Sequence, residues 1–127
     1  ADSQETERAA DVLQRAVLRC TRTLVRDRKA AEVFLRNRRD QTSALGRRWT
    51  LLTDTLRERM KQMVVQLRPE VSEADAALHS ELLVGVVFAL AEAQLDGRVE
   101  DMERAAAVAS RAMVGSVLAR ESVADAA

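Results

Sequence analysis

The second half of the chain carries an almost uninterrupted apolar stretch, Leu82-Leu83-Val84-Gly85-Val86-Val87-Phe88-Ala89-Leu90-Ala91. It is preceded by Ser72-Glu73-Ala74-Asp75, a typical helix start, because serine caps the first turn and acidic residues there complement the helix dipole. It is followed by Asp96-Gly97, where the glycine suits the left-handed backbone that often ends a helix. The stretch therefore predicts a helix that starts after Ser72 and ends near Leu95. A helix that is apolar nearly all round must be covered on more than one side.

Helical spacing continues on both sides of this stretch. Apolar residues recur at steps of three and four, which predicts further helices from about Glu5 to Asp27, Lys29 to Arg38, Ser43 to Leu67 and Val99 to Arg120. Pro69 ends the third helix, because the residue before a proline avoids the helical region. Asp2 or Ser3 is the expected cap of the first helix, and Thr42 or Ser43 that of the third. We expect the tail from Glu121 to Ala127 to be frayed.

The composition supports a single all-α domain over residues 1–127, a bundle of five helices. Four Gly and one Pro leave little material for the turns of a sheet protein. Aromatic residues are limited to Phe34, Trp49 and Phe88, so the core must consist mainly of Leu, Val, Ala and Met. The single cysteine, Cys20, excludes an internal disulfide and indicates a reducing compartment. Its position on an apolar helical stripe predicts a small buried hydrophobe.

No targeting or membrane segment is expected. The N-terminus is acidic and lacks the pattern of a signal peptide. The longest apolar runs are too short to span a bilayer. The sequence therefore predicts a cytoplasmic protein without a membrane partner.

Charge is distributed unevenly although the net charge is zero. Residues 1–68 contain 16 Lys and Arg against 9 Asp and Glu, whereas residues 69–127 contain 4 against 11. Such asymmetry indicates either that one half faces a polyanion or an anionic ligand, or that the two halves attract each other. The candidate nucleic-acid patch is the basic run Arg36-Asn37-Arg38-Arg39 together with Arg47-Arg48. Gly46, however, opens a long helix with an apolar face instead of a recognition helix, which favours a solvated basic corner.

Catalytic and metal-binding patterns are missing from the sequence. The single histidine, His79, excludes sites built on histidine pairs, and its spacing from Asp75 suits a pair on the helix surface. No glycine-rich phosphate loop is present. We therefore expect neither catalytic residues nor a metal or cofactor. The alternative is a helical enzyme that holds its substrate with Arg and Glu, but no motif in the sequence indicates one.

The second half resembles a known family in the order of its features. A long amphipathic helix ends at Arg68-Pro69-Glu70, an acidic helix start and the apolar run around Gly85 follow, and a tight turn at Asp96-Gly97 leads to an Ala-rich helix that ends with Met113-Val114-Gly115-Ser116-Val117-Leu118. This order resembles the C-terminal regulatory domain of TetR-type transcriptional regulators. The resemblance covers about residues 5–120 in architecture and residues 56–118 in sequence.

The resemblance implies a homodimer and a small-molecule effector. The last two helices of each subunit would form a four-helix interface, to which we assign Leu83, Val87, Ala105, Ala109, Ala112 and Gly115. The preceding helices would surround a cavity for an apolar or amphipathic effector, with Val17, Phe34, Leu35, Trp49, Leu52 and Phe88 as its candidate contacts. Arg22 and Arg48 are candidates for holding an acidic group of that effector.

The resemblance also sets the expected mechanism. The effector would change the tilt of the first helix and so control DNA binding, as a repressor or an activator. DNA would be contacted only through the family's N-terminal helix-turn-helix, which is absent from these residues. The alternative interpretation is a stand-alone helical protein-interaction module without an effector.

Overall fold

The computed structural model describes residues 3–37 and 44–118, which fold into helices without a strand. The elements are α1 (Ser3–Val25), α2 (Arg28–Asn37), α3 (Ala44–Leu67), α4 (Glu73–Leu95) and α5 (Met102–Leu118). The all-α bundle predicted from the sequence is confirmed, with helix ends that differ from the predicted ones by a few residues. Ser3 lies in the first turn of α1 and does not precede it. The expected cap residues Asp2, Thr42 and Ser43, the helical end at Arg120 and the tail from Glu121 lie outside the described residues.

Local capping explains where the helices begin and end. The Ser72 side chain accepts a hydrogen bond of 3.1 Å from the backbone N–H of Asp75, as the sequence pattern predicts. Gly97 has a φ of 75°, the left-handed conformation expected of it after α4. Asp101 accepts a hydrogen bond of 3.0 Å from the backbone N–H of Arg104. This cap starts α5 at Met102, which corrects the earlier start expected at Val99.

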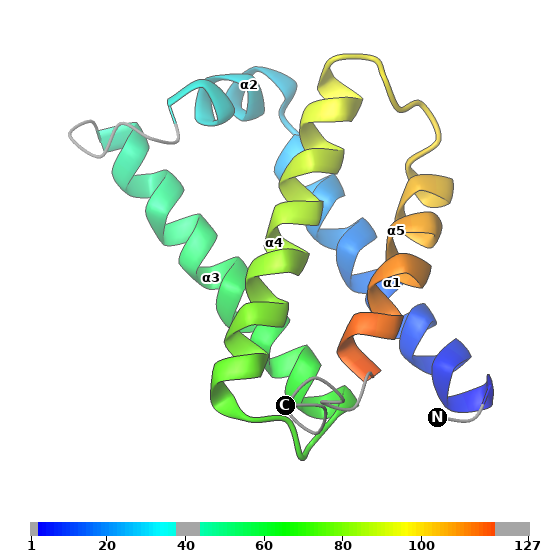
Figure 1. Ribbon diagram of the computed structural model, residues 1–127. Coiled ribbons are helices and arrows are strands. Elements are labelled where there is room, and N and C mark those ends of the chain that lie inside the picture. The colour runs from blue at the N-terminus through cyan, green and yellow to red at the C-terminus, as the bar shows by residue number, and fades with distance from the viewer. Residues whose placement is uncertain (1–2, 38–43, 119–127) are drawn as a thin grey trace, which may run out of the picture.

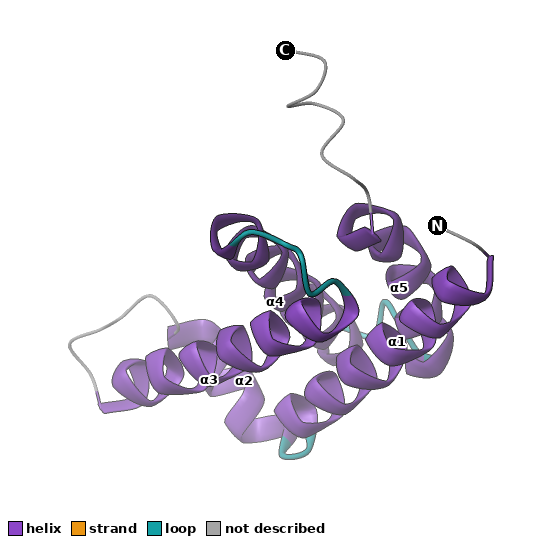
Figure 2. Ribbon diagram, turned by 90° about the horizontal axis from the view of Figure 1, so that it is seen from below, coloured by secondary structure: helices purple, strands orange, loops and turns teal. Residues whose placement is uncertain are grey.

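The helices form two layers. Helices α4 and α5 lie on one side of the bundle, whereas α1 and α3 lie on the other (Figures 1 and 2). Helix α1 packs mainly against α5 and α4, while α3 packs mainly against α4. The core between the layers is built from side chains that are at most 1% exposed: Leu13, Val17, Met60, Val64, Leu83, Val87 and Val117.

Polar contacts also fix α3 against α4. The Arg57 guanidinium donates two hydrogen bonds to Glu81, with Nε 2.7 Å from Oε2 and Nη2 3.0 Å from Oε1. The Ser80 hydroxyl donates to the backbone carbonyl of Arg57 at 2.6 Å. The hydrogen bond from Arg57 holds the pKa of the Glu81 carboxylate below its ordinary value, although partial burial opposes this shift.

One described helix, α4, has the length and apolar composition that would suffice to cross a membrane. This corrects the expectation that every apolar run is too short, because the helix extends the apolar centre in both directions. Leu83, Val84 and Val87 of α4 are nevertheless buried inside the bundle, so the structure is compatible with a soluble protein. A central helix of a soluble bundle has the same composition.

Candidate functional site

A cavity of about 410 Å³ lies between α1, α2 and α3. Its apolar wall contains two residues from each of the three helices: Cys20 and Leu24, Ala30 and Phe34, and Leu52 and Leu56. Small-molecule sites in proteins have volumes of roughly 300–1,000 Å³ and mainly apolar walls with a few polar groups. The cavity has the size and the lining of such a site.

Volume alone does not single out this cavity. Other hollows of 420–460 Å³ lie at the surface of the described chain, but polar surface makes up a much larger part of their walls than of the wall of this cavity. The hollow between α2 and α4, for example, has Glu32, Arg36, Glu92 and Asp96 in its wall. The apolar lining therefore decides which of these hollows is the candidate site.

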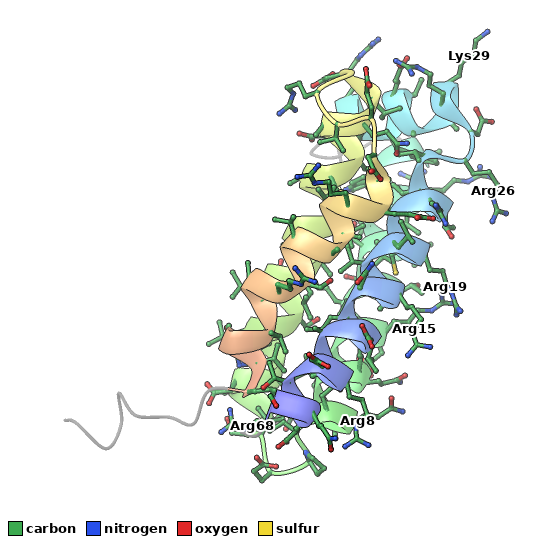
Figure 3. The ribbon with its side chains drawn as sticks, turned by 90° about the vertical axis from the view of Figure 1, so that its right-hand side faces the viewer. Arg8, Arg15, Arg19, Arg26, Lys29 and Arg68 are labelled. Carbon is green, nitrogen blue, oxygen red and sulfur yellow. The ribbon has the colours of Figure 1, made fainter. Side chains whose placement is uncertain are left out.

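Three arginines line the same cavity. Arg19 and Arg26 come from α1 and Arg59 comes from α3. All three are exposed, and within residues 3–37 and 44–118 no ion pair joins any of them to an acidic side chain. Asp27 is the one carboxylate of the described lining, so positive charge dominates there. Figure 3 shows Arg19 and Arg26 projecting from the same side of α1, on which Arg15 also lies.

Cys20 lies in the wall of the cavity and not deep in the core. Its side chain is half-buried, which corrects the expectation of a buried hydrophobe. Burial raises the pKa of the Cys20 thiol, while the positive charges of Arg59 and Arg19 act in the opposite direction. The two arginines are thus close enough to the thiol to influence its ionisation.

An aromatic cluster connects the cavity with the core. The Trp49 ring stacks on that of Phe88 with centroids 4.8 Å apart, and its centroid lies 6.0 Å from that of Phe34. Trp49 is 5% exposed, while Phe34 lines the cavity. A ligand that touches Phe34 would therefore change the surroundings of the single tryptophan.

The structure brings two of the six predicted effector contacts, Phe34 and Leu52, into the cavity lining. Trp49 and Phe88 lie behind Phe34 in the aromatic cluster, and Val17 is a core residue that is 1% exposed. Leu35 lines the separate hollow between α2 and α4.

The arginines that sequence reasoning selected are not those of the cavity. Arg22 instead forms an exposed ion pair of 3.2 Å with Glu103 of α5, and Arg48 is exposed and does not line the cavity. The sequence signal that could have identified Arg19 and Arg26 is their position on one polar stripe of α1, which they share with Arg15 and Arg22 at steps of three and four. No pattern in the sequence indicates that Arg59 lies beside this stripe.

A second feature is the outward apolar surface of α4 and α5, here called the α4–α5 face. It contains Leu78, Leu82 and Val108, which are 64%, 55% and 61% exposed. Smaller exposed residues lie between them at helical spacing: Gly85, Ala89, Ala112 and Gly115. Exposed large apolar side chains on two neighbouring helices make the α4–α5 face a candidate interaction surface.

The predicted interface residues divide into three groups. Ala112 and Gly115 belong to the α4–α5 face, whereas Ala105 and Ala109 are half-buried. Leu83 and Val87 are fully buried in the core of their own chain, so the expectation that they lie at the outer surface is corrected. Because α4 is apolar on all sides, its sequence does not reveal which side faces outward.

Nothing in residues 3–37 and 44–118 requires the two glycines of the α4–α5 face. A Cβ added to Gly85 or Gly115 would meet no atom within 4 Å, and neither glycine has a positive φ. Glycine inside a helix costs roughly 0.5–1 kcal/mol relative to alanine. Both residues therefore weaken their helices without a compensating contact among the described residues.

His79 joins α4 to α5 beside this face, with its Nδ1 3.3 Å from the Ser116 hydroxyl oxygen. No group of three or more metal-ligating side chains occurs in the part of the chain that the structure describes.

Comparison of the chain with protein-family models, with curated proteins and with solved structures gives no match. Functional inference therefore rests on the cavity and on the α4–α5 face.

Proposed function

We propose that the chain is the effector-binding and dimerisation domain of a TetR-type transcriptional regulator, controlling DNA binding by a helix-turn-helix domain joined to it. The observation that carries this proposal is the division of one small bundle into an apolar cavity on one side and an apolar outer face on the other. A sensor needs both, because the ligand and the partner subunit must bind at different places at the same time.

The proposed dimer is symmetric and uses the α4–α5 face. Pairing two copies would remove Leu78, Leu82 and Val108 of each chain from water. It would also explain Gly85 and Gly115, because a residue without a side chain lets the backbone of a partner helix approach closely. In this arrangement α4 is covered on both of its apolar sides.

Helix α1 would transmit the effector signal. It contributes Cys20 and Leu24 to the cavity and packs on the other side against α4 and α5. An effector that binds better to one tilt of α1 than to another shifts the equilibrium between them, and this difference in affinity is the whole source of its control. The cluster of Phe34, Trp49 and Phe88 gives a second contact path from the cavity to α4.

The proposal is tested with a panel of apolar and amphipathic small molecules. A compound that binds only the folded chain raises its melting temperature, and one that fills the cavity also changes Trp49 fluorescence. An Ala30→Phe variant, which places a ring in the cavity, is expected to fold normally and to lose both responses. Sedimentation of the unliganded chain at micromolar concentration should give twice the chain mass.

A panel that moves neither signal would contradict the effector-binding role. A dimer found together with that result would favour the alternative, a helical interaction module that uses the α4–α5 face alone. A strictly monomeric chain would contradict the dimerisation role.

A further inference from the structure

We propose that the ligand of the cavity is an anionic amphiphile, whose apolar tail lies between α1, α2 and α3 and whose carboxylate or phosphate group is bound by Arg19, Arg26 and Arg59. The inference rests on the proposed function in so far as the cavity is taken as the effector site. It adds the chemical class of the ligand and the residues that recognise its charged group.

The apolar part of the ligand follows from the wall of the cavity. Leu24 and Leu56 form a base that continues into the core, and Phe34 and Leu52 form the sides towards α2 and α3. An alkyl or aryl tail enclosed there would lose contact with water on several sides, which is the main source of affinity in such a site. A ligand that is charged throughout would leave this wall unused.

The charged part follows from the pairing of the arginines. Three arginines of α1, α2 and α3 that do not line the cavity have structural partners. Arg22 pairs with Glu103 and Arg57 with Glu81, and Arg28 donates to Glu32 and to the Leu95 carbonyl at 2.6 Å.

Arg19, Arg26 and Arg59 do not pair with acidic side chains among the described residues, although all three meet at one cavity. A guanidinium group binds a carboxylate or a phosphate through two parallel hydrogen bonds. Three guanidinium groups and one carboxylate, that of Asp27, give the described lining of the cavity a net positive charge. The mouth of the cavity is therefore complementary to an anion.

The alternative is a diffuse attraction of polyanions to α1. Arg15 lies on the same side of α1 as Arg19 and Arg26 but outside the cavity (Figure 3). Its Nε donates to the backbone carbonyl of Asp11 at 3.4 Å, and it has no part in the apolar lining. Arg15 is therefore a matched control, because it shares helix, side and charge with Arg19 but lies outside the cavity.

The experiment compares probes that share one alkyl tail and differ in the head group: decanoate, decyl phosphate, decanol and decyltrimethylammonium. Each is titrated below its micelle-forming concentration while Trp49 fluorescence and melting temperature are measured. We expect decanoate or decyl phosphate to bind about tenfold more tightly than decanol, as is typical of hydrogen bonds to a charged group. The cationic probe should bind most weakly. The stronger of the two anions identifies the source of the negative charge.

The variants assign the head-group contacts. Arg19→Gln and Arg59→Gln should each weaken decanoate binding roughly three- to tenfold and leave decanol binding unchanged, because each removes one solvent-exposed charged hydrogen-bond donor. Arg15→Gln should change neither. Decanoate should also slow the alkylation of Cys20 by iodoacetamide, which places the probe in this cavity and not elsewhere on the chain.

Decanol binding as tight as decanoate would overturn the inference about the charged group and leave the proposed effector cavity intact. An equal loss of decanoate affinity in Arg15→Gln and Arg19→Gln would also overturn it, in favour of diffuse attraction to α1. Failure of every probe to bind would contradict both this inference and the effector-binding role. Binding of duplex DNA that Arg19→Gln and Arg15→Gln weaken equally, without binding of decanoate, would point to a polyanion surface.

Discussion

Replacing Leu82 with alanine should weaken dimerisation and leave the fold of each chain intact, whereas the same change at the adjacent Leu83 should do the reverse. Neighbouring residues of a helix lie about 100° apart around its axis, so the two side chains leave α4 in different directions. Leu82 is 55% exposed in the isolated chain, and Leu83 is fully buried. This neighbouring pair separates the contribution of the α4–α5 face from that of the core.

The size of the effect follows from the exposed fraction. Full burial of a leucine side chain contributes about 1.5–3 kcal/mol, so the exposed half of Leu82 can contribute about 0.8–1.5 kcal/mol when a partner covers it. A symmetric dimer contains the residue twice, which gives a total of about 1.6–3 kcal/mol, or a rise in the dissociation constant of roughly 15- to 160-fold. Leu83→Ala should instead lower the free energy of unfolding by about 2–5 kcal/mol, because it opens a cavity in the core.

The assay is sedimentation velocity over a dilution series, combined with urea unfolding at a concentration at which the chain is monomeric. Leu82→Ala should shift the monomer–dimer midpoint and keep the unfolding midpoint of the monomer. A Leu82→Ala chain that dimerises as tightly as the wild type would refute the assignment of this face. A wild-type chain that stays monomeric throughout the dilution series would refute the dimer itself.

Three further sets of substitutions test other parts of the structure. Gly85→Ala and Gly115→Ala should each raise the free energy of unfolding of the monomer by roughly 0.5–1 kcal/mol, since the new methyl group meets no atom within 4 Å. Each should also weaken the dimer, because partner helices are proposed to approach there. Sedimentation and urea unfolding are measured together, and unchanged dimerisation would contradict that close approach. Thr21 is fully buried and its hydroxyl has no hydrogen-bond partner in the described structure, so Thr21→Val should raise the free energy of unfolding by about 1 kcal/mol. The control Thr53→Val should give no such gain, because the Thr53 hydroxyl already donates to a backbone carbonyl at 2.8 Å. The hydrogen bond from Arg57 lowers the pKa of the Glu81 carboxylate below its ordinary value of 4.5. The Arg57–Glu81 ion pair therefore contributes fully to the free energy of unfolding above pH 4.5 and loses this contribution as the pH falls through the lowered pKa. Glu81→Gln should therefore cost less than about 1 kcal/mol at pH 7, since both partners are about half exposed, and progressively less as the pH falls from 4.5 through the lowered value; a cost in urea unfolding that does not change on acidification would contradict this.

The elements of the fold could be predicted because their signals are local. The cap at Ser72 and the left-handed Gly97 each depend on a few neighbouring residues, and both lie where the sequence indicates. The step of three and four between apolar residues likewise identifies each helix without knowledge of the others. The start of α5 was missed because Asp101, and not an earlier residue, caps it.

The orientation of the helices and the composition of the cavity could not be predicted in this way. An apolar pattern around all of α4 gives no basis for choosing between Leu82 and Leu83 as the outward residue. Arg19 and Arg59 are far apart in sequence and meet only because α1 and α3 enclose the same cavity. Phe34 and Leu52 were found because large apolar residues on neighbouring helices are drawn to the same interior, whereas exposed arginines have no such preference.

The arginines that line the cavity have a consequence for the proposed binding of an effector. An arginine side chain stays protonated throughout the physiological pH range, unlike histidine. The affinity of the head-group site should therefore follow the ionisation of the ligand and not that of the protein. For a weak organic acid this makes the ionised form the one that is sensed. Acidification of the surroundings would then weaken the response to a fixed total amount of such an acid.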